Sequence, residues 1–336
     1  RSFTGFYKYT KNNGDSQFVS QLAQPFITSY ADNEPFETQM YDLAAGTAWL
    51  FAREALTGTF DYLFIDEAGQ VSLADAVAVS AAAKNVVLLG DPLQLAQVSQ
   101  GTHPLHAGAS VLEHLLGDVQ TVPEDRGIFL DVSHRMHPEI CKFISQAMYD
   151  GRLHAGNKTE HQSIRSPGLS GSGLRYIGIP HQGNSRESLE EALRIVSEVT
   201  LLLQGTVTDA DGVTRLMRPS DIIIVTPYNA QRRLIIKLLR DADIDLRVGT
   251  VDKFQGQEAF IVVYSMATSS GNDMPRDIGF LFERNRFNVA ISRARAVSVV
   301  LSTPRLLDTT CHSPKQMALV NLLCRYAELA EAMLPI

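Results

Sequence analysis

The stretch DIIIVTPYNAQ, residues 221–231, decides the fold class of this chain. It begins with a continuous apolar run, which is typical of a strand that is buried on both faces of a parallel sheet. A second run of this kind, NVVLLG, covers residues 85–90. Because such runs alternate with segments of helical periodicity, the pattern predicts an α/β fold with mostly parallel sheets.

The predicted elements fill most of the chain beyond residue 42. The predicted strands cover residues 43–49, 60–66, 85–90, 128–133, 174–179, 221–227, 246–251, 260–266 and 296–303. The predicted helices cover residues 72–84, 138–149, 187–204, 229–242, 286–295 and 315–332. Residues 154–173 and 205–220 are rich in Gly, Ser and charged side chains, and are predicted to be loops. Since one compact sheet rarely holds this many strands, we expect two domains, residues 1–127 and 128–336.

Composition excludes several classes of protein. The chain has 336 residues, 45% of them hydrophobic, with a net charge of −7. This charge argues against a protein that coats nucleic acid by bulk attraction, although a narrow basic groove remains compatible with it. No apolar run reaches the length of a membrane span, about 18 residues, so no membrane partner is expected. Three cysteines without a CxxC pair argue against a zinc or iron–sulfur site and fit a reducing compartment such as the cytoplasm.

The stretch FDYLFIDEAGQ, residues 60–70, places two acids at the end of an apolar strand. A carboxylate at this edge of an α/β sheet can hold Mg²⁺ through water, as Asp66 would. Its neighbour Glu67 can activate an attacking water. The alternative is that both acids simply begin the next helix, where acidic residues are favoured. The pair by itself does not decide between the two.

A glutamine and several arginines follow other predicted strands and helices. Gln94 lies on a turn after the second apolar run, where its amide can sense a phosphate. The alternative is that this turn only connects two elements and has no role in binding. Arg135 precedes a helix that we expect to begin at Pro138, and either reaches into a cleft or lies on the surface. Arg286, Arg293 and Arg295 are placed along one predicted helix, either as a solvated face or as a source of an arginine finger.

Together and in this order, these stretches resemble the motifs of the superfamily 1B helicases. The similarity is greatest to the group related to the eukaryotic RNA-surveillance helicase and to replication nuclease–helicases. FIDEAGQ is similar to motif II, LLGDPLQLAQV to motif III, SHRMHP to the tyrosine-arginine-methionine-histidine-proline element, VTPYNAQ to motif IV, TVDKFQGQE to motif V and RFNVAISRARA to motif VI. The resemblance implies two RecA-like P-loop NTPase lobes with ATP at their interface.

The resemblance also implies roles for single residues in ATP hydrolysis. Asp66 would hold Mg²⁺, and Glu67 would be the base that activates water. Gln94 would couple the γ-phosphate to the nucleic acid. Arg135 and Arg293 would contact the γ-phosphate from the second lobe.

Further residues are implied in binding. Gly256 and Glu258 would help to hold the nucleotide. His134 stands where relatives often carry a tyrosine beside the adenine, and imidazole can still stack there. The implied contacts to nucleic acid are Thr47, Thr226, Pro227, Tyr228 and Thr250.

One part of the family pattern is missing from this sequence. The phosphate-binding motif G-x-x-x-x-G-K-[ST] does not occur, and no Gly is followed by Lys. Since the family carries this loop before motif II, we expect the first lobe to be incomplete, the chain to be part of a longer polypeptide, and the chain alone to be a poor ATPase. The segments GTAWLFARE, QVSQGTHP and YSMATSSG are similar to the helicase end of bacterial fusions that carry a RecB-like nuclease domain.

The predicted function is an ATP-dependent helicase or translocase on single-stranded nucleic acid. The resemblance favours DNA over RNA and 5′-to-3′ movement. One alternative is a nucleic-acid-binding module that uses a relic helicase fold and does not hydrolyse ATP. Another is a P-loop NTPase that acts on something other than nucleic acid.

Overall fold

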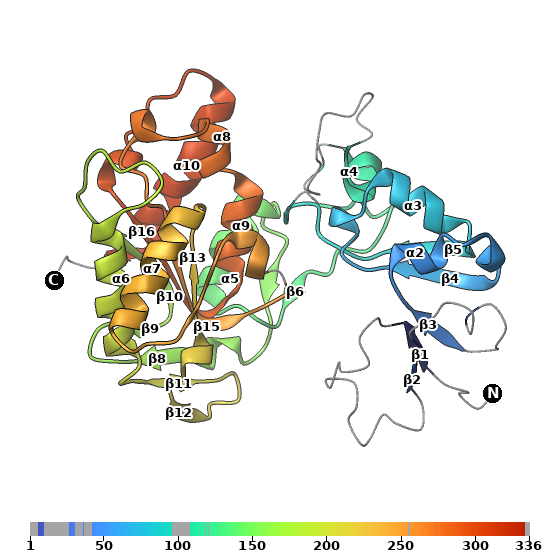
Figure 1. The fold of residues 1–336 in the computed structure, drawn as a ribbon, viewed down its shortest axis with the longest axis horizontal. Helices are drawn as coiled ribbons and strands as arrows, with labels where there is room; N and C mark the ends of the chain where they lie inside the picture. The colour runs from blue at the N-terminus through green and yellow to red at the C-terminus, as the bar shows by residue number, and fades with distance from the viewer. Residues whose placement is uncertain are drawn as a thin grey trace. The chain divides into compact units, whose positions relative to one another are not determined.

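The computed structural model describes residues 6–9, 27–30, 36, 42–95, 108–117, 119, 121–254 and 256–332 (Figure 1). The chain divides into two compact units. The first contains Arg1–Pro92 and Ala96–Asp118, and the second contains Leu93–Leu95 and Val119–Ile336. The assignment of residues 1–127 and 128–336 to two RecA-like domains stays a prediction. Within the described residues, no helix combines the length and the apolar character that crossing a membrane requires.

The second unit is built on a six-stranded sheet in the order β14-β13-β15-β16-β10-β17. All of its neighbouring strands are parallel. The strands are β10 (Gly173–Gly178), β13 (Ile222–Val225), β14 (Arg247–Gly249), β15 (Ala259–Ser265), β16 (Ala294–Ser302) and β17 (Glu331–Ala332). The predicted α/β class with mostly parallel sheets is confirmed.

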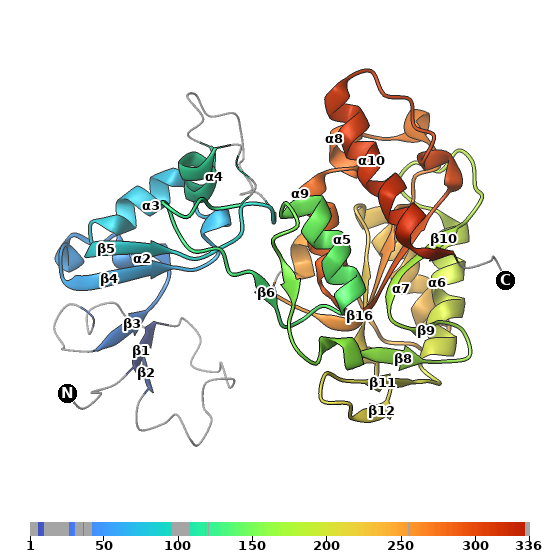
Figure 2. The same cartoon turned by 180° about the vertical axis from the view of Figure 1, so that it is seen from behind.

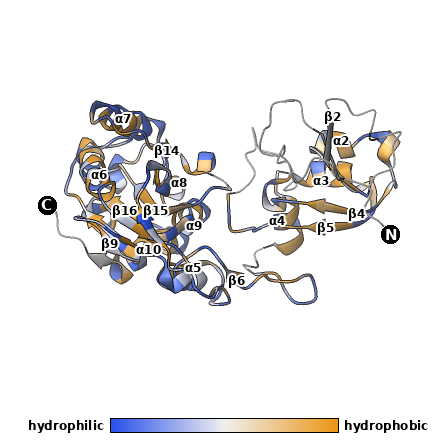
Figure 3. Ribbon diagram, turned by 90° about the horizontal axis from the view of Figure 1, so that it is seen from below, coloured by the Kyte–Doolittle hydropathy of each residue, from blue (hydrophilic) through white to orange (hydrophobic). Residues whose placement is uncertain are grey.

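Helices cover both faces of this sheet. Side chains alternate between the faces of a strand, so Ile222 and Ile224 join one hydrophobic core while Ile223 and Val225 join another. Helices α6 (Leu189–Leu202) and α7 (Asn229–Asp241) pack on the first face, and carry both hydrophobic and hydrophilic residues in Figure 3. Helices α5 (Pro138–Met148), α9 (Arg284–Ser292) and α10 (Pro314–Leu329) pack on the second, which Figure 2 shows. Burial on both faces explains the continuous apolar run at the start of DIIIVTPYNAQ.

The first unit has a smaller parallel sheet, and one of its faces remains partly exposed. Strands β4 (Phe60–Ile65) and β5 (Ala83–Leu88) pair, and Leu63 and Ile65 pack with helices α3 (Leu73–Ser80) and α4 (Val111–Leu116). On the other face, Tyr62 and Phe64 are 60% and 59% exposed. Within NVVLLG itself, Val86 and Leu89 are 41% and 44% exposed, so the expectation that this run is buried on both faces is wrong.

Several predicted boundaries differ from the structure. The predicted strand 43–49 ends early: β3 (Leu43–Ala45) pairs with β1 (Phe6–Tyr9), which also pairs with β2 (Ile27–Tyr30), and helix α2 (Ala48–Phe51) follows. The predicted helix 286–295 ends at Ser292, so Arg295 lies in β16. Of the predicted strand 128–133, only β6 (Val132–Ser133) forms.

The two predicted loops are wrong in part, because each contains short strands. They are β7 (His154–Ala155), β8 (Ser163–Arg165), β9 (Ser170–Gly171), β11 (Thr206–Thr208) and β12 (Thr214–Leu216). Four of them form an antiparallel sheet in the order β12-β11-β8-β9, while β7 pairs with β6. Strands of two or three residues are too short to show alternation in the sequence. Tertiary contacts stabilise them instead. For example, Nη1 and Nη2 of Arg215 in β12 each donate to one carboxylate oxygen of Asp221, at 2.6 Å.

The remaining helices are short. Helix α8 covers Ile278–Leu281, and 3-10 helices cover Glu54–Leu56, Ala68–Gln70, Thr159–His161, Pro219–Asp221, Val251–Phe254, Gly271–Asp273 and Pro304–Leu306. Most of them connect a strand to the next longer helix or strand.

The double burial of β13 makes the stability of the second unit sensitive to its side chains. Ile224 is fully buried, so Ile224→Ala is expected to lower the free energy of unfolding by about 2–5 kcal/mol. Ile128 is 87% exposed, and Ile128→Ala should change it by no more than about 0.5 kcal/mol. Chemical denaturation followed by circular dichroism measures both, and equal effects of the two substitutions would contradict this account of the core.

Candidate functional site

The acidic turn after β4 has an unusual backbone. The Asp66 side chain is exposed, and its Oδ1 accepts a hydrogen bond of 2.9 Å from the backbone N–H of Glu67. Glu67 has a φ of 51°, a left-handed conformation that is uncommon for a residue with a side chain and is concentrated at functional sites. The next α-helix begins only at Leu73, after the N-cap Ser72. Glu67 is the N-cap residue of the short 3-10 helix Ala68–Gln70 but makes no side-chain cap hydrogen bond, so the two acids precede this single turn and do not begin α3.

Two glycines bring the turn after β5 against this acidic turn. A Cβ on Gly69 would lie 2.7 Å from the carbonyl oxygen of Asp91, and a Cβ on Gly90 would lie 2.8 Å from the nitrogen of Ala68. The Ala68 N–H donates to the Leu89 carbonyl at 2.8 Å. Only glycine fits where the two backbones approach so closely. Gly69 and Gly90 therefore allow the acidic turn and the turn after β5 to pack against each other.

Asp66 fits Mg²⁺ only if further ligands arrive with a nucleotide. Among the residues that the structure describes, no group of three His, Cys, Asp or Glu side chains could hold a metal ion. Magnesium needs less from the protein, because it commonly keeps several waters and takes one or two carboxylates together with substrate phosphates. One exposed carboxylate at a strand end meets that requirement.

Arg135 and Glu258, both predicted to be site residues, form an ion pair in the second unit. The Arg135 Nε donates to Glu258 Oε2 at 2.8 Å, and Arg295 Nη1 lies 3.8 Å from the other carboxylate oxygen. Gln162, which is 1% exposed, donates to the Arg135 carbonyl and accepts from Arg295 Nε. The Arg295 guanidinium also stacks 4.4 Å from the ring centre of Phe260. The sequence contains no signal for the role of Gln162, which comes from a predicted loop.

Arg293 attaches to the same loop as Glu258. It is 4% exposed, and its Nη1 donates to the backbone carbonyl of Gln257 at 3.0 Å. Gly256 has a φ of 70°, which favours glycine. The structure thus brings Arg135, Arg293 and Glu258 around one turn that begins at Gly256. His134 is exposed, and Gln94 is half-buried in the part of motif III that belongs to the second unit.

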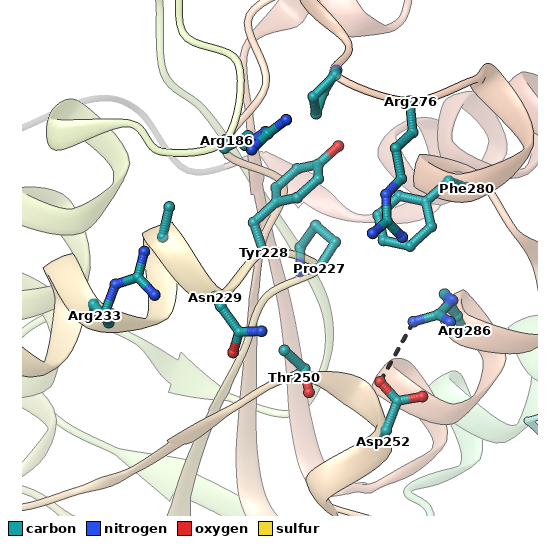
Figure 4. A pocket seen from close by; sticks show the side chains of 12 residues that line it. Arg186, Pro227, Tyr228, Asn229, Arg233, Thr250, Asp252, Arg276, Phe280 and Arg286 are labelled. Atoms are coloured by element: carbon teal, nitrogen blue, oxygen red, sulfur yellow. Dashed lines mark hydrogen bonds and ion pairs between the residues drawn. The ribbon is translucent and has the colours of Figure 1, made fainter. Parts of the chain in front are cut away.

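A pocket of about 430 Å³ opens at the carboxyl ends of β13 and β14 (Figure 4). Pro227, Tyr228 and Thr250 line it, so the structure brings these three predicted nucleic-acid contacts together. Thr226 does not line the pocket: it is fully buried, and its hydroxyl has no hydrogen-bond partner among the described residues. Thr47 is exposed in the first unit, where it precedes α2.

The rest of the pocket lining contains four arginines and one aromatic ring. The lining includes Arg186, Arg233, Arg276, Arg286 and Phe280. The Arg276 and Arg286 guanidinium groups lie 4.4 Å and 5.0 Å from the ring centre of Phe280. Arg186, Arg276 and Phe280 were not predicted as site residues from the sequence. They come from loops and from the short helix α8, and only the tertiary structure brings them to Tyr228.

The charge of this pocket is opposite to that of the whole chain. Arg286 is paired with Glu283 at 2.6 Å and with Asp252 at 3.5 Å. Across the described residues, no carboxylate lies within ion-pairing distance of Arg186, Arg233 or Arg276. Burial raises the pKa of the Tyr228 phenol, so it stays protonated at neutral pH and can donate a hydrogen bond. The pocket is a concave, positively charged surface with aromatic walls.

A family model described as an AAA domain matches residues 108–305, more than half of the chain. The chain belongs to the AAA domain family. The match includes the Arg135–Glu258 pair, Arg293 and the pocket lining, but it begins after the acidic turn of the first unit.

Named helicases are among the relatives of this AAA domain chain. It is 29% identical over 246 residues to the DNA polymerase alpha-associated DNA helicase A of Schizosaccharomyces pombe, covering 70% of this chain and 36% of that protein. It is 31% identical over 244 residues to the regulator of nonsense transcripts 1 homolog of Neurospora crassa, covering 67% and 21%. It is 28% identical over 273 residues to the DNA replication ATP-dependent helicase/nuclease DNA2 of Gallus gallus, covering 78% and 26%. The predicted resemblance to this group of helicases is confirmed, and the chain spans about a fifth to about a third of their length.

His137 links the helicase element SHRMHP to the start of α5. It is the N-cap residue, 8% exposed, and its Nδ1 accepts a hydrogen bond of 3.3 Å from the backbone N–H of Glu139. Burial lowers the pKa of His137. Protonation of Nδ1 would replace this acceptor with a donor and add a positive charge to the helix N-terminus, which disfavours cations.

This cap is expected to make the AAA domain chain sensitive to acid. The folded-state pKa lies below the unfolded value of about 6.5, so the unfolded state binds more protons and stability is lost as the pH falls below about 6.5. Asparagine caps helices without titrating, so His137→Asn should show a smaller drop in unfolding temperature than the wild type between about pH 7.5 and pH 5.5. The exposed His154 offers a control, His154→Asn. The same pH dependence in wild type and His137→Asn would contradict the proposed cap.

Proposed function

We propose that this chain is part of an ATP-dependent helicase or translocase, and that the pocket of the second unit holds a single strand of nucleic acid. The arginine-rich and aromatic lining of the pocket carries the proposal. Proteins that bind single strands combine positive charge along the backbone with aromatic side chains against the bases. Pro227, Tyr228 and Thr250, which the sequence resemblance assigns to the strand, support it by meeting in this pocket.

Each group of the lining has a chemical use in this proposal. Guanidinium groups bind phosphate oxygens through paired hydrogen bonds, and Arg186, Arg233 and Arg276 are available for this. Bases stack on aromatic rings and on guanidinium planes, and the Arg276 group stacked on Phe280 offers such a plane. The negative charge of the whole chain would be compatible with this role, because salt screens charges that lie more than about 8–10 Å from the bound strand.

The residues for ATP hydrolysis are proposed from the helicase resemblance and from their chemistry. Asp66 would hold Mg²⁺ and Glu67 would take the proton of the attacking water. Arg135 and Arg293 would stabilise charge on the γ-phosphate. ATP supplies the phosphoanhydride bond whose hydrolysis drives movement. DNA as the strand, 5′-to-3′ movement and a RecB-like nuclease domain on the same parent polypeptide remain proposals that rest on the resemblance alone.

The alternative is a nucleic-acid-binding module that does not hydrolyse ATP. It is supported by one observation: the arginine-rich pocket proposed for the strand lies within the second unit, whereas Asp66 and Glu67, proposed for hydrolysis, lie in the first. A module of this kind would bind single strands with the same affinity whether or not a nucleotide is present.

The pocket is tested with single substitutions and a labelled oligonucleotide. Arg276→Ala is expected to weaken binding of a fluorescein-labelled dT20 by about tenfold, and to reduce the slope of log K against log salt by about 0.7, the value for one phosphate contact on a single strand. Arg240→Ala removes an exposed arginine of α7 outside the pocket lining and is the matched control. Fluorescence anisotropy at several salt concentrations measures both.

The same assay separates further outcomes. A parallel titration with rU20 reports whether the strand is DNA or RNA. Equal weakening by Arg276→Ala and Arg240→Ala would mean that the oligonucleotide binds by general charge and not in the pocket. A folded wild type that binds neither dT20 nor rU20 would overturn the proposed strand site.

ATP turnover tests the catalytic part. We expect this chain to hydrolyse ATP at background level, with or without dT20, because it lacks the lysine and amides of the phosphate loop. In a longer polypeptide that supplies the loop, turnover should rise with dT20 and fall by at least about 10²-fold in Glu67→Gln, as expected for the loss of a general base. Turnover by this chain that disappears in Glu67→Gln would contradict the first expectation. Turnover that ignores DNA and RNA would point to an NTPase with another target.

A further inference from the structure

A buried polar network lies at the carboxyl end of β15 and contains none of the residues proposed for ATP hydrolysis. Its centre is Glu191, which is fully buried in the first turn of α6. Glu191 Oε1 is hydrogen-bonded to His181 Nε2 at 3.0 Å. Its Oε2 accepts from the Ser265 hydroxyl at 2.6 Å and from the backbone N–H of Ala267 at 2.9 Å. One carboxylate thus joins α6, the loop before it and the end of β15.

Gln231 of α7 extends this network. Its Oε1 accepts from the Ser188 N–H at 2.8 Å, and its Nε2 donates to the Ser188 carbonyl at 3.1 Å and to the Ser265 hydroxyl at 3.0 Å. The Ser188 hydroxyl in turn caps α6 by accepting from the Glu191 N–H. The side chains of Ser188, Gln231 and Ser265 are fully buried. The network is therefore a rigid, solvent-free connection between α6, α7 and β15.

The atoms of His181, Glu191 and Ser269 have the connectivity of a serine–histidine–acid triad. His181 Nδ1 is 2.7 Å from the Ser269 hydroxyl. However, Ser269 is fully buried and His181 is 5% exposed, so no substrate reaches the hydroxyl. The same hydroxyl accepts from the backbone N–H of Asn184. This arrangement therefore fits a role in holding the backbone and not in nucleophilic catalysis.

The backbone that the network holds is strained at Ala267. This residue has a φ of 64°, and the N–H of Thr268 donates to the carbonyl of Met266 at 2.8 Å. A three-residue turn with a positive central φ is the rarer and more strained form of the γ-turn. Strain of this kind persists only where surrounding contacts determine the conformation. Glu191 makes such a contact, because it accepts the N–H of Ala267 itself.

The residues that follow this turn do not line the candidate strand pocket themselves, but they contact Tyr228, which lines it, and the segment that leads to Arg186. The Thr268 hydroxyl donates to the Ser185 carbonyl at 2.8 Å and lies 3.4 Å from the Tyr228 hydroxyl. The Ser269 N–H donates to the Asn184 carbonyl at 2.9 Å. Arg186, which follows Ser185, and Tyr228 both line the pocket. The position of these two side chains therefore depends on the turn at Ala267.

We propose that Glu191 is a positioning residue for the strand pocket. With His181, it holds the strained turn at Ala267, and through Thr268 and Ser269 it keeps Arg186 and Tyr228 in the geometry that grips a phosphate and a base. The effect on strand binding rests on the proposed function. The effect of Glu191 on the conformation of the turn at Ala267 does not, because it depends only on contacts within the folded chain. Glu191 and His181 do not contact the strand in this proposal; Arg186 and Tyr228 do.

A rescue experiment tests the proposal. Glu191→Gln keeps the size of the side chain but replaces an acceptor oxygen with a donor, and is expected to weaken dT20 binding by about tenfold. Glycine adopts a φ of 64° without strain, so Ala267→Gly in the Glu191→Gln background should restore most of the lost affinity. The exposed Glu328 of α10 provides Glu328→Gln, which removes the same charge and should leave binding unchanged.

Amide hydrogen exchange gives a second readout that needs no nucleic acid. Glu191→Gln is expected to speed exchange at Ala267 and Ser269 by at least about tenfold, while the amides of Ile261–Tyr264 in β15 keep their protection. If wild type does not bind dT20, the proposed function fails but this exchange pattern still decides the inference. Unchanged exchange in Glu191→Gln, affinity equal to that of a binding wild type, or no rescue by Ala267→Gly would overturn it. Loss of protection throughout β15 would also overturn it, because it would show a purely structural role.

Discussion

The structure of the second unit depends on the burial of one parallel sheet between two layers of helices. Consecutive residues of β13 enter opposite cores, and every residue of β15 is buried. Because all strands of the sheet run in the same direction, their carboxyl ends share one edge. Pro227 and Tyr228 follow β13 there, Thr250 follows β14, and the turn at Ala267 follows β15. The direction of the sheet therefore brings Pro227, Tyr228 and Thr250 to the edge where the pocket lies.

Two of the five non-glycine residues with a positive φ among the described residues lie at or behind the proposed sites. Glu67 in the acidic turn and Ala267 behind the strand pocket both have a left-handed φ. In each case a carboxylate accepts the N–H of the residue concerned: Asp66 for Glu67, and Glu191 for Ala267. Charge-assisted hydrogen bonds of this kind are stronger than neutral ones, so they can hold conformations that local propensity does not favour.

Six arginines at the proposed sites of the second unit divide into two groups by the partners they have, whereas Arg286 of the pocket lining is paired with Glu283 and Asp252. Arg135, Arg295 and Arg293 are attached to the turn after Gly256 through Glu258 and the Gln257 carbonyl. The pocket arginines Arg186, Arg233 and Arg276 have no carboxylate partner within the described residues. The first group is held in place by the protein, whereas the second presents its charge to the pocket. This division is compatible with phosphate contacts of two different kinds.

The sequence by itself determined the class of the fold, the order of its main strands and helices, and the residues at the strand ends, because apolar runs and turn residues are local properties of the chain. It also predicted site residues: the roles of Asp66, Glu67, Arg135 and Glu258 stay predictions, while the structure places Pro227, Tyr228 and Thr250 in the lining of one pocket. It did not identify the small antiparallel sheet, whose strands of two or three residues carry no periodic signal. Nor did it identify Arg186, Phe280 or the network of His181, Glu191 and Gln231. These residues lie far apart in the chain, and only the packing of loops against the end of one buried sheet brings their side chains within hydrogen-bonding and stacking distance.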